Sequence, residues 1–196
     1  MIKRLFDVMA AVVGLLVLSP LFALVALAIK LTSRGPVFFR QERVGRDFQT
    51  FRIYKFRTMV VDAPRLGGQI TAGRDPRITS IGHLLRKTKL DELPQLLNVL
   101  SGAMSLVGPR PEVPKYVEMF RPQFAEVLSV RPGITDLASV KYRDENEILG
   151  QADDPEAAYV NQVLPDKLAL ATEYVRRASF WFDVRLIFAT FWKVLR

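Results

Sequence analysis

An uncharged apolar stretch near the N-terminus places the strongest limit on how this chain can fold. The 22 residues from Val8 to Ile29 contain no charged side chain, and a helix of that length can cross the hydrocarbon core of a bilayer. A cleaved signal peptide normally has a shorter apolar region. The sequence therefore predicts a membrane helix within residues 1–33, followed by a second unit formed by residues 34–196.

The middle of the apolar stretch is interrupted by Ser19-Pro20. A proline inside a helix removes one backbone hydrogen bond and bends the helix. Basic residues flank both ends, with Lys3 before and Lys30 after, so the preference of basic residues for the cytoplasmic side gives no orientation to a straight crossing. A re-entrant helix that bends at Ser19-Pro20 and keeps both ends cytoplasmic agrees with both observations. A straight span stays open, because spanning helices tolerate proline.

The positive charge of the chain is concentrated directly after this stretch. The formal net charge is +8 at pH 7, and residues 30–89 alone carry 14 basic and four acidic side chains. Such a concentration favours an anionic partner, either nucleic acid, anionic lipid or a diphosphate. Because a protein held at a membrane is a poor candidate for nucleic-acid binding, we expect no nucleic-acid partner.

The rest of the sequence predicts an α+β fold, mainly helical with one β-hairpin. Aromatic and β-branched runs flank the turn Val44-Gly45-Arg46-Asp47, as in a hairpin. A helix through Arg86 is capped by Thr79 or Ser80, and an exposed acidic loop is expected over residues 144–156. Further helices are expected over residues 113–130, 167–177 and 180–195.

The last of these helices combines Trp and Phe with basic neighbours. It either packs on the core or lies as an interfacial amphipathic helix at the membrane surface. The chain has no cysteine and one histidine, which excludes disulfides, a cysteine nucleophile and a histidine-rich metal site. Acid–base or nucleophilic chemistry must therefore use carboxylates, Lys, Tyr, Ser or Thr.

Asp91 and Glu92 form an acidic pair at the start of a short helix that Gly102 ends. Acids at a helix start have a structural explanation, since they cap N–H groups and favour the helix dipole. The same place, beside Arg86, would hold Asp91 ionised and offer N–H donors to a phosphate. Arg110 lies between two prolines and suits phosphate recognition. Because Mg²⁺ binds carboxylates together with substrate phosphates, these residues indicate phosphoryl chemistry on a membrane-resident acceptor.

Four longer motifs follow the apolar N-terminus in a fixed order. Together they cover nearly the whole chain and resemble the small monotopic phosphoglycosyl transferases, the bacterial sugar transferases that initiate glycan assembly. By that resemblance the chain begins at the catalytic core, without the extra membrane helices of the larger members. The motifs are Lys55-Phe56-Arg57-Thr58-Met59, Asp75-Pro76-Arg77-Ile78-Thr79, Leu90-Asp91-Glu92-Leu93-Pro94-Gln95-Leu96 and Ser105-Leu106-Val107-Gly108-Pro109-Arg110-Pro111-Glu112.

The resemblance implies a two-step transfer of a sugar-1-phosphate from a UDP-sugar to undecaprenyl phosphate, with release of UMP. Asp91 would be the nucleophile that forms a covalent phosphosugar-aspartate intermediate. Glu92 would act as a base or organising group, and Mg²⁺ would bind at Asp91 and the diphosphate. The enzyme would lie on the cytoplasmic face of the bacterial inner membrane, through a re-entrant helix, and would begin the membrane steps of polysaccharide synthesis.

The resemblance also assigns the basic residues around the acidic pair. Arg86 and Arg110 match phosphate-binding positions of the family, and Lys55 and Arg57 are further substrate-binding candidates. Two alternatives remain. One is direct transfer between the two phosphates with Asp91 as a Mg²⁺ ligand only, and the other is a non-enzymatic protein that binds anionic membrane surfaces.

One segment departs from the family pattern. Many members continue the Pro-Gly-Ile-Thr turn with Gly and then Gln-Val-Asn-Gly-Arg, whereas here Thr135 is followed by Asp136-Leu137-Ala138-Ser139. We therefore carry no sugar or nucleotide contact over to the segment from Ile134 to Glu145, and we assign no sugar, glycan pathway or oligomeric state.

Overall fold

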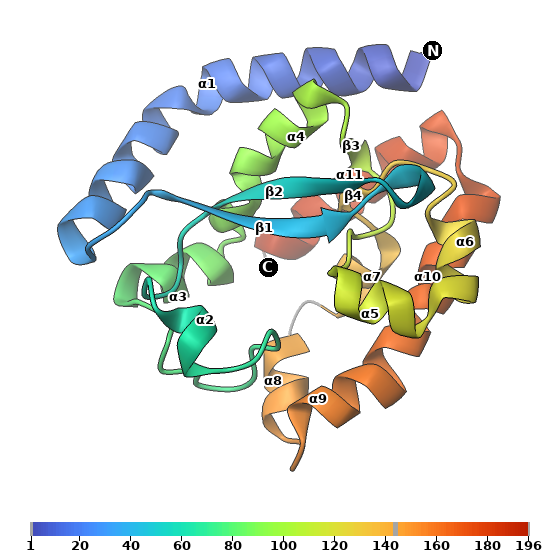
Figure 1. Cartoon of the computed structure of the whole chain (residues 1–196). Coiled ribbons are helices and arrows are strands. Elements are labelled where there is room, and N and C mark those ends of the chain that lie inside the picture. Colours follow the sequence, from blue (N-terminus) through green and yellow to red (C-terminus); the bar gives the residue numbers. More distant parts are fainter. Residues whose placement is uncertain (1, 143–144, 196) are drawn as a thin grey trace.

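The computed structural model describes residues 2–142 and 145–195, which are mostly helical, as expected (Figure 1). The strands are β1 (Phe38–Val44), β2 (Thr50–Phe56), β3 (Ser105–Val107) and β4 (Gly133–Thr135). Two 3-10 turns and one π-helical turn occur, namely η1 (Arg46–Phe48), η2 (Leu90–Gln95) and η3 (Tyr159–Val163). The α-helices are α1 (Ile2–Thr32), α2 (Ala63–Leu66), α3 (Ser80–Lys87), α4 (Leu96–Ser101), α5 (Pro114–Met119), α6 (Arg121–Val127), α7 (Leu137–Lys141), α8 (Glu145–Gly150), α9 (Pro155–Ala158), α10 (Leu164–Arg177) and α11 (Phe180–Leu195).

The apolar stretch forms one long helix, α1, which runs along one side of the molecule and bends near its middle (Figure 1). Pro20 lies inside the helix and has no N–H to donate to the carbonyl of Leu16. The hydroxyl of Ser19 donates to that carbonyl instead, at 2.8 Å. Such a local side-chain bond beside a proline accounts for the bend. Among the described residues, α1 alone is long and apolar enough to cross a membrane.

Most of α1 is exposed. Its buried side chains are few, and near the bend Leu16 and Val17 are 69% and 70% exposed. The start of the helix is nevertheless attached to the rest of the chain, because Asp7 accepts hydrogen bonds from the hydroxyl of Ser105 at 2.8 Å and from the N–H of Leu106 at 3.2 Å. The long apolar face thus belongs to a helix whose first turns are held by polar contacts.

Those first turns also contact the C-terminal helix α11. Lys3 forms an ion pair with Asp183, and the rings of Phe6 and Phe180 meet edge to face at 5.5 Å. The helices expected near the C-terminus are confirmed as α10 and α11. On α11, Trp181 is 73% exposed, so this helix presents aromatic surface beside α1.

The expected hairpin is confirmed by β1 and β2, which pair antiparallel from Phe38↔Phe56 to Val44↔Thr50. The other edge of β2 is covered by a side chain of α4. The amide of Asn98 accepts from the N–H of Tyr54 at 2.9 Å and donates to the carbonyl of Arg52 at 2.8 Å. Asn98 thereby occupies backbone groups of β2 as a further strand would.

A second pairing was not expected from the sequence. The strands β3 and β4 pair parallel, with Ser105 opposite Gly133 and Val107 opposite Thr135. The two backbones approach so closely at Gly108 and Gly133 that a Cβ on Gly133 would lie 2.0 Å from the nitrogen of Gly108. Each strand has three residues, which is too short to show an alternating pattern in the sequence.

Two expectations about the second half of the chain were wrong. The helix expected over 113–130 is divided into α5 and α6, because Phe120 has non-helical angles just before Pro122. The exposed loop expected over 144–156 contains α8 and α9 instead. Within it Leu149 is buried in the core and Asp154 caps α9 through two N–H bonds of 3.0 Å, while Asp144 lies outside the described residues.

Candidate active site

The acidic pair lies in η2, the 3-10 turn that joins α3 to α4. Lys89 precedes it in the left-handed region, with a φ of 58°, and Pro94 lies inside the turn. Gly102 ends α4 with a φ of 87°, as expected. The acids therefore lie in the first turn of a 3-10 helix that continues into α4, and not at the start of an α-helix as expected. Asp91 and Glu92 are buried, at 7% and 9% exposure.

Glu92 binds two cations from other parts of the chain. Lys55 on β2 lies 2.8 Å from one carboxylate oxygen, and Arg110 donates from both terminal nitrogens, one at 3.2 Å. Burial opposes ionisation of Glu92, but the charges of Arg110 and Lys55 outweigh it and hold its pKa well below the usual range. Glu92 is therefore an ionised group that joins the hairpin to the loop carrying Arg110.

Asp91 has a different environment from its neighbour. Its Oδ1 atom is buried and finds no hydrogen-bond partner among the described residues. Burial raises the pKa of Asp91, and the charge of Glu92 raises it further, against the opposite effects of Lys55 and Arg86. The basic neighbours therefore act in the expected direction, but burial and the charge of Glu92 outweigh them, and the pKa of Asp91 is raised overall. Asp91 is a desolvated carboxylate with an unused oxygen, which is the condition of a reactive group.

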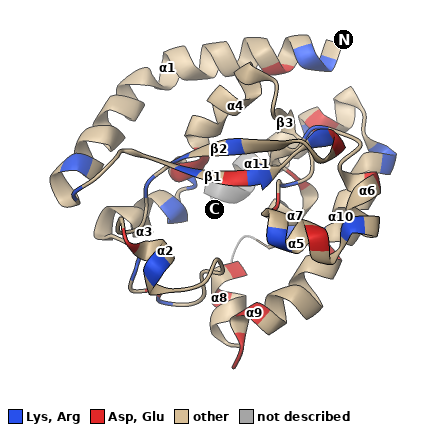
Figure 2. Ribbon diagram, viewed as in Figure 1, with Lys and Arg blue, Asp and Glu red and all other residues tan. Residues whose placement is uncertain are grey.

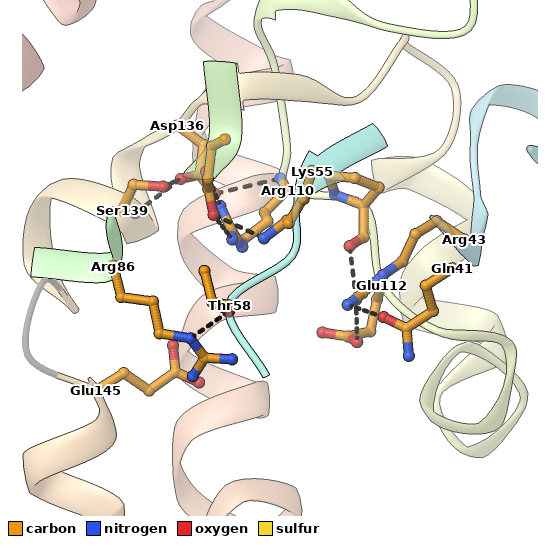
Figure 3. Close-up of polar contacts among 12 residues, drawn as sticks. Gln41, Arg43, Lys55, Thr58, Arg86, Arg110, Glu112, Asp136, Ser139 and Glu145 are labelled. Carbon is orange, nitrogen blue, oxygen red and sulfur yellow. Dashed lines mark hydrogen bonds and ion pairs between the residues drawn. The ribbon is translucent and has the colours of Figure 1, made fainter. Parts of the chain in front are cut away.

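Arg86 lies near the end of α3, close enough to Asp91 for the two charges to interact. Its Nε donates to the hydroxyl of Thr58 at 2.9 Å (Figure 3). Burial lowers the pKa of Arg86, and the charges of Asp91 and Asp75 act against that effect. No role for Thr58 was predicted from the sequence, although it lies within one of the four motifs.

Arg57 is the predicted site residue that the structure does not bring to this cluster. Its guanidinium donates to the hydroxyl of Ser33 at 2.8 Å, to the carbonyl of Ser33 at 3.0 Å and to the carbonyl of Arg34. These groups follow the end of α1. Arg57 therefore joins the residue after β2 to the segment after α1, and its role in substrate binding stays a prediction.

A second polar cluster adjoins the first and was missed in the sequence. Arg43 on β1 forms an ion pair of 3.1 Å with Glu112 and donates to the side chain of Gln41 at 2.8 Å (Figure 3). Glu112 also accepts from Tyr159. The sequence did contain an indication of this cluster. Gln41 and Arg43 are two residues apart on β1, and by the register of the hairpin they lie on the same face as Lys55.

The segment from Ile134 to Glu145, which departs from the family pattern, also reaches this region. Asp136 accepts from the backbone N–H of Arg110 at 3.2 Å, and Glu145 accepts from Lys167 at 2.6 Å. A small cavity of about 30 Å³ lies between Arg110, Asp136 and Lys167. Residues 143–144 of the segment lie outside the described residues.

Charge is distributed unevenly around the cluster. Lys and Arg occupy the hairpin, α2 and α3, whereas Asp and Glu gather on α8 and α9 (Figure 2). Among the described residues, no three carboxylate or histidine side chains gather as a metal-binding group. A divalent ion at Asp91 would thus need phosphate oxygens of a substrate to complete its ligands, which is how Mg²⁺ is commonly bound. The unused Oδ1 of Asp91 fits that arrangement.

The sequence is similar to those of known proteins over nearly its whole length. A sequence model of the family described as bacterial sugar transferase matches residues 1–196. The UDP-glucose:undecaprenyl-phosphate glucose-1-phosphate transferase of Escherichia coli K12 is 38% identical over 98% of this chain and 40% of its own length. A UDP-N-acetylgalactosamine-undecaprenyl-phosphate N-acetylgalactosaminephosphotransferase of Aeromonas hydrophila is 40% identical over 99% of this chain and 44% of its own. This chain therefore spans less than half of those relatives.

A relative of similar length is the exopolysaccharide production protein PSS of Rhizobium leguminosarum bv. phaseoli. It is 40% identical over 96% of this chain and 92% of its own length. Similarity thus extends both to longer proteins and to one that this chain nearly covers.

Proposed function

This chain belongs to the bacterial sugar transferase family, and from that premise we propose that it transfers a sugar-1-phosphate from a UDP-sugar to undecaprenyl phosphate. The observation that carries the proposal is the buried, unpartnered oxygen of Asp91, which lies beside a cation-bound Glu92. Three cations surround the pair and suit a diphosphate, namely Lys55, Arg86 and Arg110.

The proposed reaction has two displacements at phosphorus. In the first, a carboxylate oxygen of Asp91 attacks the phosphorus that carries the sugar, and the bond from that phosphorus to the bridging oxygen breaks, so that UMP leaves with the electron pair. In the second, an oxygen of undecaprenyl phosphate attacks the same phosphorus and the carboxylate of Asp91 leaves. The products are UMP and a polyprenyl diphosphate sugar. Covalent catalysis of this type divides one difficult step into two.

The environment of Asp91 supports its role as the nucleophile. A carboxylate that is desolvated and lacks a hydrogen bond on one oxygen is less stabilised in the free enzyme, so less stabilisation is lost when that oxygen forms a bond. Glu92 is an organising group, because its lowered pKa and its two cation contacts keep it ionised and keep Lys55 and Arg110 in place. Arg86 and Arg110 bind phosphate oxygens.

Magnesium is the cofactor we propose, held by Asp91 together with the diphosphate of the donor. When bound, Mg²⁺ neutralises charge on the diphosphate and assists departure of UMP. The chain itself contributes the single carboxylate, and its cations orient the phosphates. The second displacement then uses the same cations on the phosphate of the lipid acceptor.

We also propose the position of the chain at the membrane. Residues 1–33 form a re-entrant helix at the cytoplasmic face of the bacterial inner membrane, with α11 in the interface. The bend at Ser19-Pro20, the exposed apolar face of α1 and the exposed Trp181 support this arrangement. The chain has no cysteine, so Ile2→Cys and Thr32→Cys can be labelled singly in intact spheroplasts. Labelling of either position by an impermeant reagent from outside would refute cytoplasmic placement of both ends.

The experiment that tests the reaction is UMP release with and without the acceptor. Detergent-solubilised protein with Mg²⁺ is mixed with each of a panel of UDP-sugars. A covalent intermediate predicts about one UMP per enzyme in the absence of undecaprenyl phosphate, together with a mass increase of one phosphosugar on the peptide containing Asp91. Direct transfer with Asp91 as a metal ligand predicts no UMP until the acceptor is added.

Two variants complete the experiment. Asp91→Asn should abolish both the burst and turnover, whereas Asp62→Asn, at a side chain 70% exposed, should leave both intact. Turnover that survives in Asp91→Asn would refute the nucleophile. Vesicle binding that is unaffected by Asp91→Asn, with no UMP released from any sugar nucleotide by the wild type, would favour the non-enzymatic membrane-binding alternative.

A further inference from the structure

The chain segment that carries Arg110 continues the parallel pairing of β3 with β4. The N–H of Gly108 donates to the carbonyl of Thr135 at 3.0 Å, and the N–H of Gly133 donates to the carbonyl of Pro109 at 2.9 Å. Because Gly108 and Gly133 are in direct backbone contact, the two segments are fixed relative to one another just before Arg110.

Asp136 extends this ladder by one more bond. After β4 the chain turns into α7, which begins at Leu137. Its backbone therefore no longer presents a carbonyl to the N–H of Arg110 on the paired segment. The Oδ2 atom of Asp136 takes that place and accepts from the N–H of Arg110 at 3.2 Å. Its Oδ1 atom accepts from the N–H of Ser139 at 2.7 Å and from the hydroxyl of Ser139, and so caps α7. Asp136 is 3% exposed.

The side chain of Arg110 needs such support. Its guanidinium reaches Glu92 across the site, and its backbone lies between Pro109 and Pro111, which have no N–H to donate. The N–H of Arg110 is therefore the one backbone donor within residues 109–111. Figure 3 shows Asp136 and Ser139 beside Arg110, and the charge of Asp136 adds to that of Glu92 in raising the pKa of Arg110.

We propose that Asp136 is a positioning residue, which holds the backbone of Arg110 so that its guanidinium faces the diphosphate of the donor. The proposal rests on the function proposed above, since it takes a nucleoside diphosphate as the group that Arg110 recognises. Asp136 is buried and already accepts bonds from Arg110 and Ser139, so it acts through Arg110 and does not touch the substrate.

The variant that isolates this role is Asp136→Ser. Serine caps helices about as well as aspartate, but its single, shorter hydroxyl does not serve Ser139 and Arg110 together. The matched control is Ser139→Ala, which removes the hydroxyl bond to Asp136 and keeps both the N–H cap and the bond to Arg110. Thermal unfolding of both variants shows whether either change damages the fold.

The measurement is a double-mutant cycle with Arg110→Ala. Loss of a hydrogen bond to a charged acceptor corresponds to about a tenfold effect or more, so Asp136→Ser should lower kcat/KM for the active UDP-sugar about tenfold in the wild-type background. In the Arg110→Ala background the same change should have little further effect. A merely structural role would multiply the loss equally in both backgrounds, and that result would overturn the proposal.

The same cycle is measured on the Kd of UDP, which needs neither turnover nor the correct sugar. A weaker Kd on Asp136→Ser that disappears in the Arg110→Ala background supports the positioning role, even if no UDP-sugar in the panel releases UMP and the proposed function fails. Turnover in the wild type with equal losses in both backgrounds supports the function and refutes the positioning role. An unchanged Kd and kcat/KM in Asp136→Ser also refutes it.

Discussion

Removing the charge of Glu92 and removing that of its neighbour Asp91 should have different effects on the melting temperature, Tm. Glu92→Gln takes the counter-charge from Lys55, whose side chain is 18% exposed, and from Arg110, whose side chain is 36% exposed. Removing one partner of a buried ion pair costs about 3–5 kcal/mol. For a protein of this size each kcal/mol corresponds to about 2–4 °C in Tm, so Glu92→Gln should lower Tm by roughly 6–20 °C.

Asp91→Asn removes a charge that burial disfavours and that lacks a hydrogen bond on Oδ1. We expect Tm to stay at the wild-type value or to rise by roughly 0–4 °C, the equivalent of about 1 kcal/mol or less. Both variants should lose UMP release, Asp91→Asn through the missing nucleophile and Glu92→Gln through the displaced cations. Removing the charge of Asp91 should therefore abolish activity without loss of stability, whereas removing that of Glu92 should reduce both.

The assay is thermal unfolding in detergent with EDTA, so that a bound metal ion does not add to the stability of one variant. Asp62→Asn, an exposed carboxylate, serves as the control for general loss of negative charge and should keep the wild-type Tm. The reasoning is refuted if Asp91→Asn loses as much Tm as Glu92→Gln, or if Glu92→Gln unfolds at the wild-type temperature.

Three further changes test other contacts. Hydrogen bonds from Arg77 outweigh burial and hold the pKa of Asp75 below its usual value. Ionised Asp75 therefore stabilises the fold at neutral pH, and the Tm difference between wild type and Asp75→Asn should close as pH falls below about 4. Asn98→Ala leaves two groups of β2 unpaired and should cost about 2–4 kcal/mol, measured by denaturant unfolding; an unchanged midpoint would contradict the contact. Asp183→Asn weakens the ion pair with Lys3 and should speed proteolysis near the N-terminus, whereas an unchanged digestion rate would show that this pair does not hold α1.

The parts of the fold that follow a repeating pattern or begin at a helix-capping residue were predictable from the sequence. The apolar run gave the long helix, alternating aromatic residues gave the hairpin, and Thr79 capped α3 as expected, accepting from the N–H of Gly82 at 3.1 Å. The β3–β4 pair was not predictable, because a parallel pairing between residues distant in sequence depends on the close approach of Gly108 and Gly133, which no local pattern records.

The candidate site was predictable to the extent that single motifs contain its residues. Asp91, Glu92, Arg86, Arg110 and Lys55 come together as expected. Their electrostatic balance could not be predicted, since it depends on which carboxylate the cations reach. The structure gives those contacts to Glu92 and leaves an oxygen of its neighbour unused.

The side chain that covers β2 has a consequence for the crowded membrane surface at which we place this chain. An open strand edge is a template on which another chain can add a strand. The amide of Asn98 occupies a donor and an acceptor of β2, and so denies that edge to a neighbouring polypeptide. Because Asn98 is itself buried on α4, this protection comes from the body of the fold and does not depend on an exposed side chain.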